Sequence, residues 1–191
     1  MKLRPDQLNS HLQQSLAPIY VLGGDEPLQL QEACDAIRSA ARQQGFTERE
    51  VMHVDRSFKW DELSQSADSL SLFGDKKMIE VRMPTGKPGD QGAKALRAYA
   101  EDPPPDNLLM VICDKLDSAT VRTKWASALE QAGVLMQVWP IEAARLPDWV
   151  RGRMAHVGIQ ASVEAIALLV ERVEGNMLAA AQEIEKLVLL Y

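Results

Sequence analysis

The chain has 191 residues, of which 46% are hydrophobic and 25% are charged, and its formal net charge is −6. This composition is typical of a globular protein with one domain or slightly more, and the negative charge excludes a general electrostatic attraction to nucleic acid. The two cysteines, Cys34 and Cys113, lie in apolar segments, which indicates buried and reduced thiols. No apolar run is long enough to cross a bilayer and the opening residues do not resemble a secretion signal, so we expect a cytoplasmic protein.

Short apolar segments alternate with amphipathic ones through the first 140 residues. The apolar segments predict five strands, over residues 19–22, 50–54, 77–82, 108–112 and 134–138. Apolar residues at helical spacing predict helices over residues 5–17, 27–44, 60–68, 91–101 and 120–132. This alternation predicts an α/β fold, with a parallel five-stranded sheet covered by helices on both faces.

The strand signals stop after Pro140. Helical patterns follow over residues 146–158, 163–174 and 176–191, which predicts a small domain of three helices. The last pattern reaches the final residue with no stop signal, so we expect the chain to be part of a longer protein.

An apolar segment interrupts the expected surface between the third helix and the third strand. Leu72 and Phe73 stand directly before Gly74, in a turn that would normally face water. The two side chains either fold back onto the core or project to bind another protein. Burying both would contribute roughly 3–6 kcal/mol, enough for a useful docking contact.

The turn after the first strand has the position of a phosphate-binding loop but not its residues. A G-x-x-x-x-G-K-[ST] loop needs a lysine for the phosphates and a hydroxyl for Mg²⁺. Counted from Gly23, these two positions fall on Gln29 and Leu30. Counting from Gly24 supplies neither residue. The sequence therefore predicts no nucleotide-binding residues.

Residues that could support other chemistry are scattered. The third strand ends in Arg82, where an acidic pair would be needed to hold a metal, and the fourth is followed by a single acidic residue, Asp114. The three histidines lack metal-ligand spacing relative to one another and to the cysteines. We therefore predict no catalytic residue, no metal site and no cofactor.

The order of elements and three segments resemble a known family. Residues 17–28 read APIYVLGGDEPL, residues 69–74 read SLSLFG, and residues 174–187 read EGNMLAAAQEIEKL. Together with the altered phosphate loop and the helical domain, they resemble an AAA+ module that lacks ATPase residues. Within that group the chain resembles the delta subunits of the bacterial DNA polymerase III clamp loader.

The resemblance implies a clamp-binding element at Leu70, Ser71, Leu72 and Phe73. In the family, Leu72 and Phe73 would enter a hydrophobic pocket of the ring-shaped sliding clamp, the beta subunit, which favours the exposed reading of this segment. The AAA+ lid motif would carry an arginine for the nucleotide at position 178, where this chain has Leu178.

The resemblance also implies a division of the chain. Residues 1–140 would form an AAA+-like α/β domain without a functional phosphate loop, which carries the clamp-binding element. Residues 141–191 would form the helical lid domain. A C-terminal collar domain, which joins the other clamp-loader subunits, would lie outside this chain.

The implied function is that of a non-catalytic subunit of a nucleotidyltransferase complex. It would bind and help open the sliding clamp during DNA replication, and would meet DNA only indirectly or within the full complex, with no membrane contact. One alternative is a P-loop-type nucleotide-binding enzyme with a divergent loop. The other is a different clamp-loader subunit. Those subunits resemble this chain in architecture but carry a four-cysteine zinc module, which two cysteines cannot supply.

Overall fold

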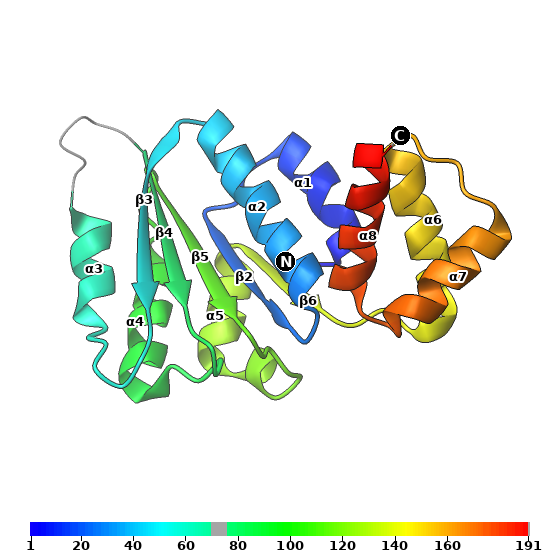
Figure 1. Cartoon of the computed structure of the whole chain (residues 1–191). Helices are drawn as coiled ribbons and strands as arrows, with labels where there is room; N and C mark the ends of the chain where they lie inside the picture. Colours follow the sequence, from blue (N-terminus) through cyan, green and yellow to red (C-terminus); the bar gives the residue numbers. More distant parts are fainter. Residues whose placement is uncertain (70–75, 191) are drawn as a thin grey trace. The chain divides into compact units, whose positions relative to one another are not determined.

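Figure 1 shows a computed structural model of the chain, which describes residues 1–69 and 76–190. The chain divides into two compact units, Met1–Trp139 and Pro140–Tyr191. The first unit has an α/β fold and the second is helical.

The first unit is built on a parallel sheet. Among the described residues this sheet has six strands, in the order β1-β6-β2-β5-β4-β3, and every neighbouring pair is parallel. The α/β class and the parallel sheet were predicted correctly, but the number of five strands was wrong. The strands are β1 (Lys2–Leu3), β2 (Ile19–Gly24), β3 (Phe46–His53), β4 (Lys76–Arg82), β5 (Asn107–Cys113) and β6 (Val134–Val138).

The additional strand is β1, at the edge of the sheet. Lys2 pairs with Leu135 and Leu3 with Met136, and the Leu135 amide donates to the Met1 carbonyl at 2.9 Å. A strand of two residues is too short to show an alternating pattern, so its pairing with β6 is visible only in the fold.

Helices cover both faces of the sheet (Figure 1). One face packs against α1 (Leu8–Gln14) and α2 (Pro27–Gln43). The opposite face packs against α3 (Asp61–Asp68), α4 (Gly89–Glu101) and α5 (Lys124–Ala132). Short 3₁₀ turns, η1 (Pro5–Gln7) and η2 (Thr120–Arg122), precede α1 and α5.

Two hydrophobic cores result from this layering. Along β5, Leu108 and Met110 belong to the core under α2, whereas Leu109 and Val111 belong to the core under α4 and α5. All four side chains are fully buried. Because a parallel strand is covered on both faces, nearly every residue of β5 is apolar.

The second unit contains η3 (Ala143–Arg145), α6 (Leu146–His156), α7 (Val163–Val173) and α8 (Met177–Leu190). The Ser162 hydroxyl accepts from the Ala165 amide at 3.2 Å and caps α7. A core lies between these helices and is formed by Leu146, Val150, Met154, Ile166, Val173, Met177, Ala180, Ala181 and Ile184. Within the part of the chain that the structure describes, no helix is long and apolar enough to span a membrane.

Candidate functional site

The predicted clamp-binding residues Leu70, Ser71, Leu72 and Phe73 lie outside the described residues, in the stretch 70–75. The described chain ends on one side at Ser69, directly after α3, and resumes on the other at Lys76, where β4 begins. The structure therefore shows the residues that flank this segment on both sides.

A group of polar side chains surrounds the end of α3. Lys77 is buried, and its ammonium donates to the Ser66 carbonyl at 3.2 Å and to the Ser69 hydroxyl at 2.8 Å. Asn107 is also buried, and its amide donates to the Ala67 carbonyl at 2.9 Å. The Ser69 amide donates to the Gln65 carbonyl at 3.0 Å. The exit of α3 toward residue 70 is therefore held by side chains of β4 and β5.

The turn between β2 and α2 is too tightly packed to act as an open loop. A Cβ atom added at Gly24 would lie 1.7 Å from the Val138 carbonyl oxygen, and one at Gly23 would lie 2.6 Å from the Cys113 carbonyl oxygen. The Asp25 amide donates to the Val138 carbonyl at 3.1 Å. The two glycines therefore allow the neighbouring strands to approach closely. The Asp25 amide, which could otherwise face a phosphate, is bonded to β6.

The beginning of α2 carries its own carboxylate. Glu26 is buried, and its side chain accepts from the Gln29 amide at 2.6 Å. The first residue of α2 is Pro27, which has no amide proton to offer. A helix N-terminus normally favours an anion. Here the Glu26 carboxylate occupies that position, and its charge opposes the approach of a phosphate.

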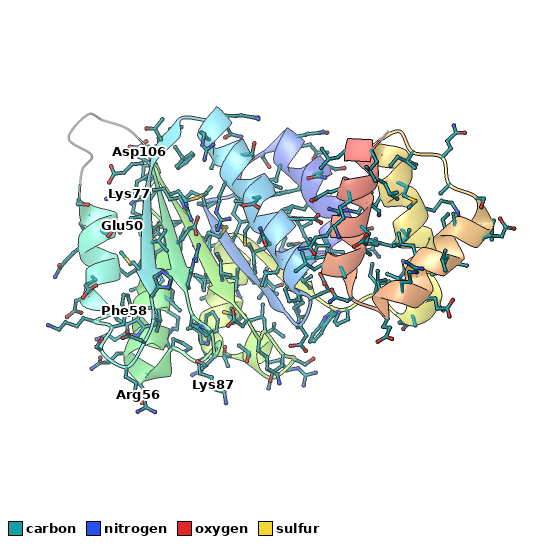
Figure 2. All side chains as sticks on the ribbon, viewed as in Figure 1. Glu50, Arg56, Phe58, Lys77, Lys87 and Asp106 are labelled. Carbon is teal, nitrogen blue, oxygen red and sulfur yellow. The ribbon has the colours of Figure 1, made fainter. Side chains whose placement is uncertain are left out.

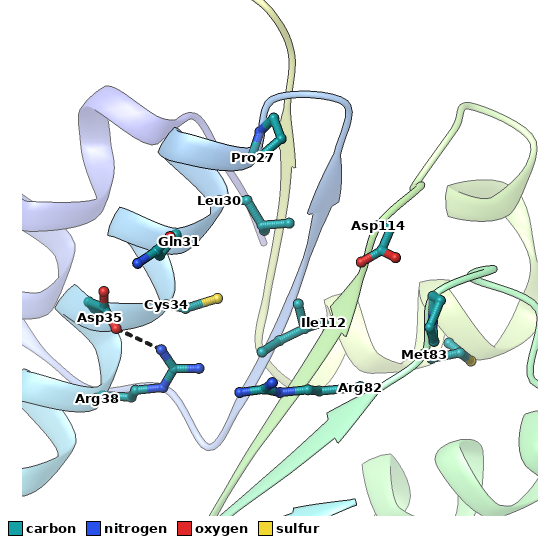
Figure 3. Close-up of a pocket in the computed structure, with 11 residues that line it drawn as sticks. Pro27, Leu30, Gln31, Cys34, Asp35, Arg38, Arg82, Met83, Ile112 and Asp114 are labelled. Carbon is teal, nitrogen blue, oxygen red and sulfur yellow. Dashed lines mark hydrogen bonds and ion pairs between the residues drawn. The ribbon is translucent and has the colours of Figure 1, made fainter. Parts of the chain in front are cut away.

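A pocket of about 380 Å³ lies beside this turn, between α2 and the carboxyl ends of β4 and β5 (Figure 3). Leu30 and Ile112 give it an apolar floor, and Arg38, Arg82 and Asp114 contribute charges. Arg38 is already paired within the chain, with Asp35 at 2.6 Å. Among the described residues, no group of three or more histidine, cysteine, aspartate or glutamate side chains could hold a metal ion.

A buried carboxylate lies on β4, on the face of the sheet that packs against α2. Glu80 is fully buried and accepts from Arg38 at 2.7 and 2.9 Å and from Arg49 at 2.5 and 3.0 Å. Arg82 lies 3.6 Å away. Burial by itself would raise the pKa of Glu80, but the hydrogen bonds from Arg38 and Arg49 outweigh it and lower this pKa to about 2. Glu80 is therefore an ionised structural group.

The cysteines and His11 have structural surroundings. Burial raises the pKa of the Cys34 thiol to about 11 and that of the Cys113 thiol to about 12, so neither is a reactive thiolate. The His11 ring lies 3.1 Å from the Tyr20 hydroxyl, and burial lowers its pKa. His53 lies in β3 and His156 at the end of α6, in different elements from His11.

In the second unit, the segment that corresponds to the lid motif forms a turn between two helices. Glu174 has φ 49° and Gly175 has φ 84°, which ends α7. The Asn176 side chain accepts from the Ala179 amide at 3.0 Å at the start of α8. Leu178 is 44% exposed and carries no group that could bind a phosphate.

Sequence reasoning missed three features: the Glu26 cap, the Glu80 cluster and the buried pair Lys77 and Asn107. Each had a partial signal. Glu26 directly precedes a proline suited to the first turn of a helix. Lys77, Glu80 and Asn107 are polar residues within or beside buried apolar strands, where an unpaired polar group would be costly.

Comparisons with known proteins place this arrangement in a family. The model of the DNA polymerase III delta subunit family matches residues 20–138. The chain is 32% identical over its whole length to DNA polymerase III subunit delta of Escherichia coli strain K12, and 33% identical to that of Haemophilus influenzae strain Rd. In each case it spans 56% of the relative's length.

Solved structures share the fold. The chain resembles a Bacillus subtilis DNA clamp loader delta protein with a TM-score of 0.72 and 24% identity, over 97% of this chain and 57% of that one. It resembles the Thermotoga maritima RuvB Holliday junction branch migration motor with a TM-score of 0.56 and 12% identity, over 94% and 60%. These likenesses support an AAA+-like architecture. With the family match over residues 20–138, they lead to one conclusion: the chain belongs to the DNA polymerase III delta subunit family.

Proposed function

We propose that this chain is the part of a clamp-loader delta subunit that binds the sliding clamp, the beta subunit, and helps open it during DNA replication. The family match carries the proposal, because it spans residues 20–138 and so includes the segment with Leu70, Ser71, Leu72 and Phe73. In this proposal, Leu72 and Phe73 enter a hydrophobic pocket of the clamp. Opening requires that the segment bind an opened form of the ring better than the closed form.

The proposed role needs no chemical step by this chain, which we assign as non-catalytic and free of cofactor. The closed β2–α2 turn and the Glu26 carboxylate at the start of α2 support this assignment. A nucleotide would have to displace that carboxylate from the helix end and would find no lysine there. This argues against the P-loop enzyme, the main alternative.

We assign residues 1–140 to the AAA+-like domain that carries the clamp-binding segment and residues 141–191 to the helical lid. Assembly with the other clamp-loader subunits is assigned to a collar domain outside these residues. DNA would be contacted only indirectly or within the complete loader, in the cytoplasm.

The test is a calorimetric titration of purified sliding clamp with this chain and with the double variant Leu72→Ala, Phe73→Ala. Removing both side chains forfeits about 3 kcal/mol or more of buried apolar contact, so the affinity should fall by more than about 100-fold. The matched control is Leu189→Ala, Leu190→Ala, which removes two apolar side chains that are 86% and 76% exposed on α8. Clamp binding that survives the first double variant refutes the assignment, and saturable ATP binding would revive the enzyme alternative.

A further inference from the structure

A polar row crosses three neighbouring strands beneath α3. Glu48 of β3 pairs in register with Lys77 of β4, and Lys77 pairs in register with Asn107 of β5. The following residues on this face, such as Ile79 and Leu109, are apolar and belong to the core. The row therefore stands at the amino ends of the strands, next to the end of α3.

Lys77 is an unusual residue for this place. Its side chain is only 6% exposed, and lysine is almost never buried unless it has partners. Transfer of an ammonium from water carries a desolvation cost that an apolar residue would avoid. If position 77 only filled the core, an apolar side chain would do so without this cost. The presence of a lysine therefore has to be explained by what its ammonium contacts.

Those contacts are directed at the last turn of α3. The last four carbonyls of a helix have no partner within it. Here the Ser66 carbonyl accepts from Lys77 at 3.2 Å and the Ala67 carbonyl accepts from Asn107 at 2.9 Å. A positive charge at this end also matches the helix dipole. The two side chains therefore fix the orientation in which α3 ends.

Two carboxylates of β3 balance the lysine charge. Glu48 lies 3.5 Å and Glu50 3.7 Å from the Lys77 ammonium, and the two side chains are 42% and 43% exposed. Glu50 also accepts from the Ser66 hydroxyl at 2.5 Å. Figure 2 shows Glu50 and Lys77 beside α3. Because both carboxylates reach solvent, they tolerate removal of the lysine charge.

The hydrogen bond between Ser69 and Lys77 joins the two ends of the stretch 70–75. At 2.8 Å it links the residue directly before this stretch to the second residue after it. Closing a loop and fixing its ends has an entropic cost, and a binding segment whose ends are already fixed avoids that part of the cost when it binds. We propose that Lys77 and Asn107 are positioning residues for clamp binding, a role that rests on the proposed function.

The test compares Lys77→Met and Asn107→Ala with the unsubstituted chain in the calorimetric titration with purified sliding clamp. Each variant should bind about tenfold more weakly, which equals about 1.4 kcal/mol. In both variants, amide hydrogen exchange should become faster at residues 66–69. The two variants remove different hydrogen-bond donors from the same end of α3. If one variant fails to fold, the other still tests the proposal.

Two controls separate positioning from charge and from general stability. Lys87→Met makes the same substitution at an exposed lysine and should leave the affinity unchanged. Leu129→Ala truncates a fully buried side chain of α5, so it lowers stability away from α3 and should also keep the affinity.

The inference is overturned if the Lys77 and Asn107 variants bind the clamp as well as the unsubstituted chain while exchange at residues 66–69 is faster. It is also overturned if Leu129→Ala weakens binding as much as they do. Failure of the unsubstituted chain to bind the clamp refutes the proposed function and this role with it, and is recognised in the first titration.

Discussion

Replacing Glu80 with glutamine should remove the main acid-sensitive contribution to the stability of the first unit. The carboxylate is fully buried between Arg38 and Arg49, and its pKa falls from 4.5 to about 2 in the folded chain. Because the folded pKa lies below the unfolded one, ionisation of Glu80 stabilises the fold above pH 4.5, and this contribution is lost as the pH falls toward 2. The difference of the two pKa values corresponds to about 3 kcal/mol at pH 7.

The magnitude agrees with the geometry. Breaking a buried pair by removing one partner typically costs about 3–5 kcal/mol. For Glu80→Gln we expect a cost at the lower end of this range, because Arg38 keeps Asp35 as a partner and the Arg49 side chain is 42% exposed. Linkage gives the expected pH dependence: the stability difference between the unsubstituted chain and Glu80→Gln should shrink by about 2 kcal/mol between pH 5 and pH 3.

Urea unfolding followed by tryptophan fluorescence measures this difference. A Trp149→Phe background leaves the three remaining tryptophans in the first unit, so the signal reports that unit. The control is Asp6→Asn, which removes an exposed ion pair with Arg4 and should cost less than about 1 kcal/mol. A stability difference that stays constant from pH 5 to pH 3 would show that Glu80 is not the ionised, arginine-bound group described above.

Three further predictions concern the β2–α2 turn and the thiols. Gly24→Ala should destabilise the first unit by about 3 kcal/mol or more in urea unfolding, because the new Cβ would overlap the Val138 carbonyl; a normal unfolding midpoint would contradict this. Glu26→Ala should cost about 1 kcal/mol in the same assay through loss of the helix cap, and no loss would mean that the cap is dispensable. Cys34 and Cys113 should resist a thiol reagent at pH 8 in the folded chain and react in urea, since burial raises both pKa values; rapid labelling of the folded chain would be the contrary result.

The features that follow from local patterns could be predicted from the sequence. The five predicted strands are all present, and β2 and β5 show the continuous apolar runs that buried parallel strands have. The edge strand β3 is mostly polar and begins at Phe46, four residues before the predicted start at residue 50. The cap at Ser162 follows from its place before an apolar helix. The strand β1 was missed because two residues carry no periodicity. Whether Leu72 and Phe73 are exposed stays a prediction, since both lie outside the described residues.

The polar clusters could not be predicted because their partners are distant in the sequence. Glu80 and Arg38 are 42 residues apart, and Asn107 and Ala67 are 40 residues apart. A polar residue in an apolar strand shows that some partner must exist, but only the fold selects which one. The register of three strands was needed to bring Glu48, Lys77 and Asn107 into one row.

The two ends of the parallel strands differ in the residues that this chain places there. Open α/β sheets hold ligands at the carboxyl ends of their strands. In this chain the carboxyl ends of the strands have the closed Gly24 turn and the Glu26 cap. The amino ends of the strands have the buried donors Lys77 and Asn107, at the beginnings of β4 and β5. Burying a charged side chain has a desolvation cost, which its hydrogen bonds must offset. Here the hydrogen bonds of Lys77 and Asn107 hold the end of α3, directly before residue 70. The described residues that flank the proposed clamp-binding segment, Ser69 and Lys76, therefore lie at the amino ends of the strands, away from the carboxyl ends where open α/β sheets bind ligands.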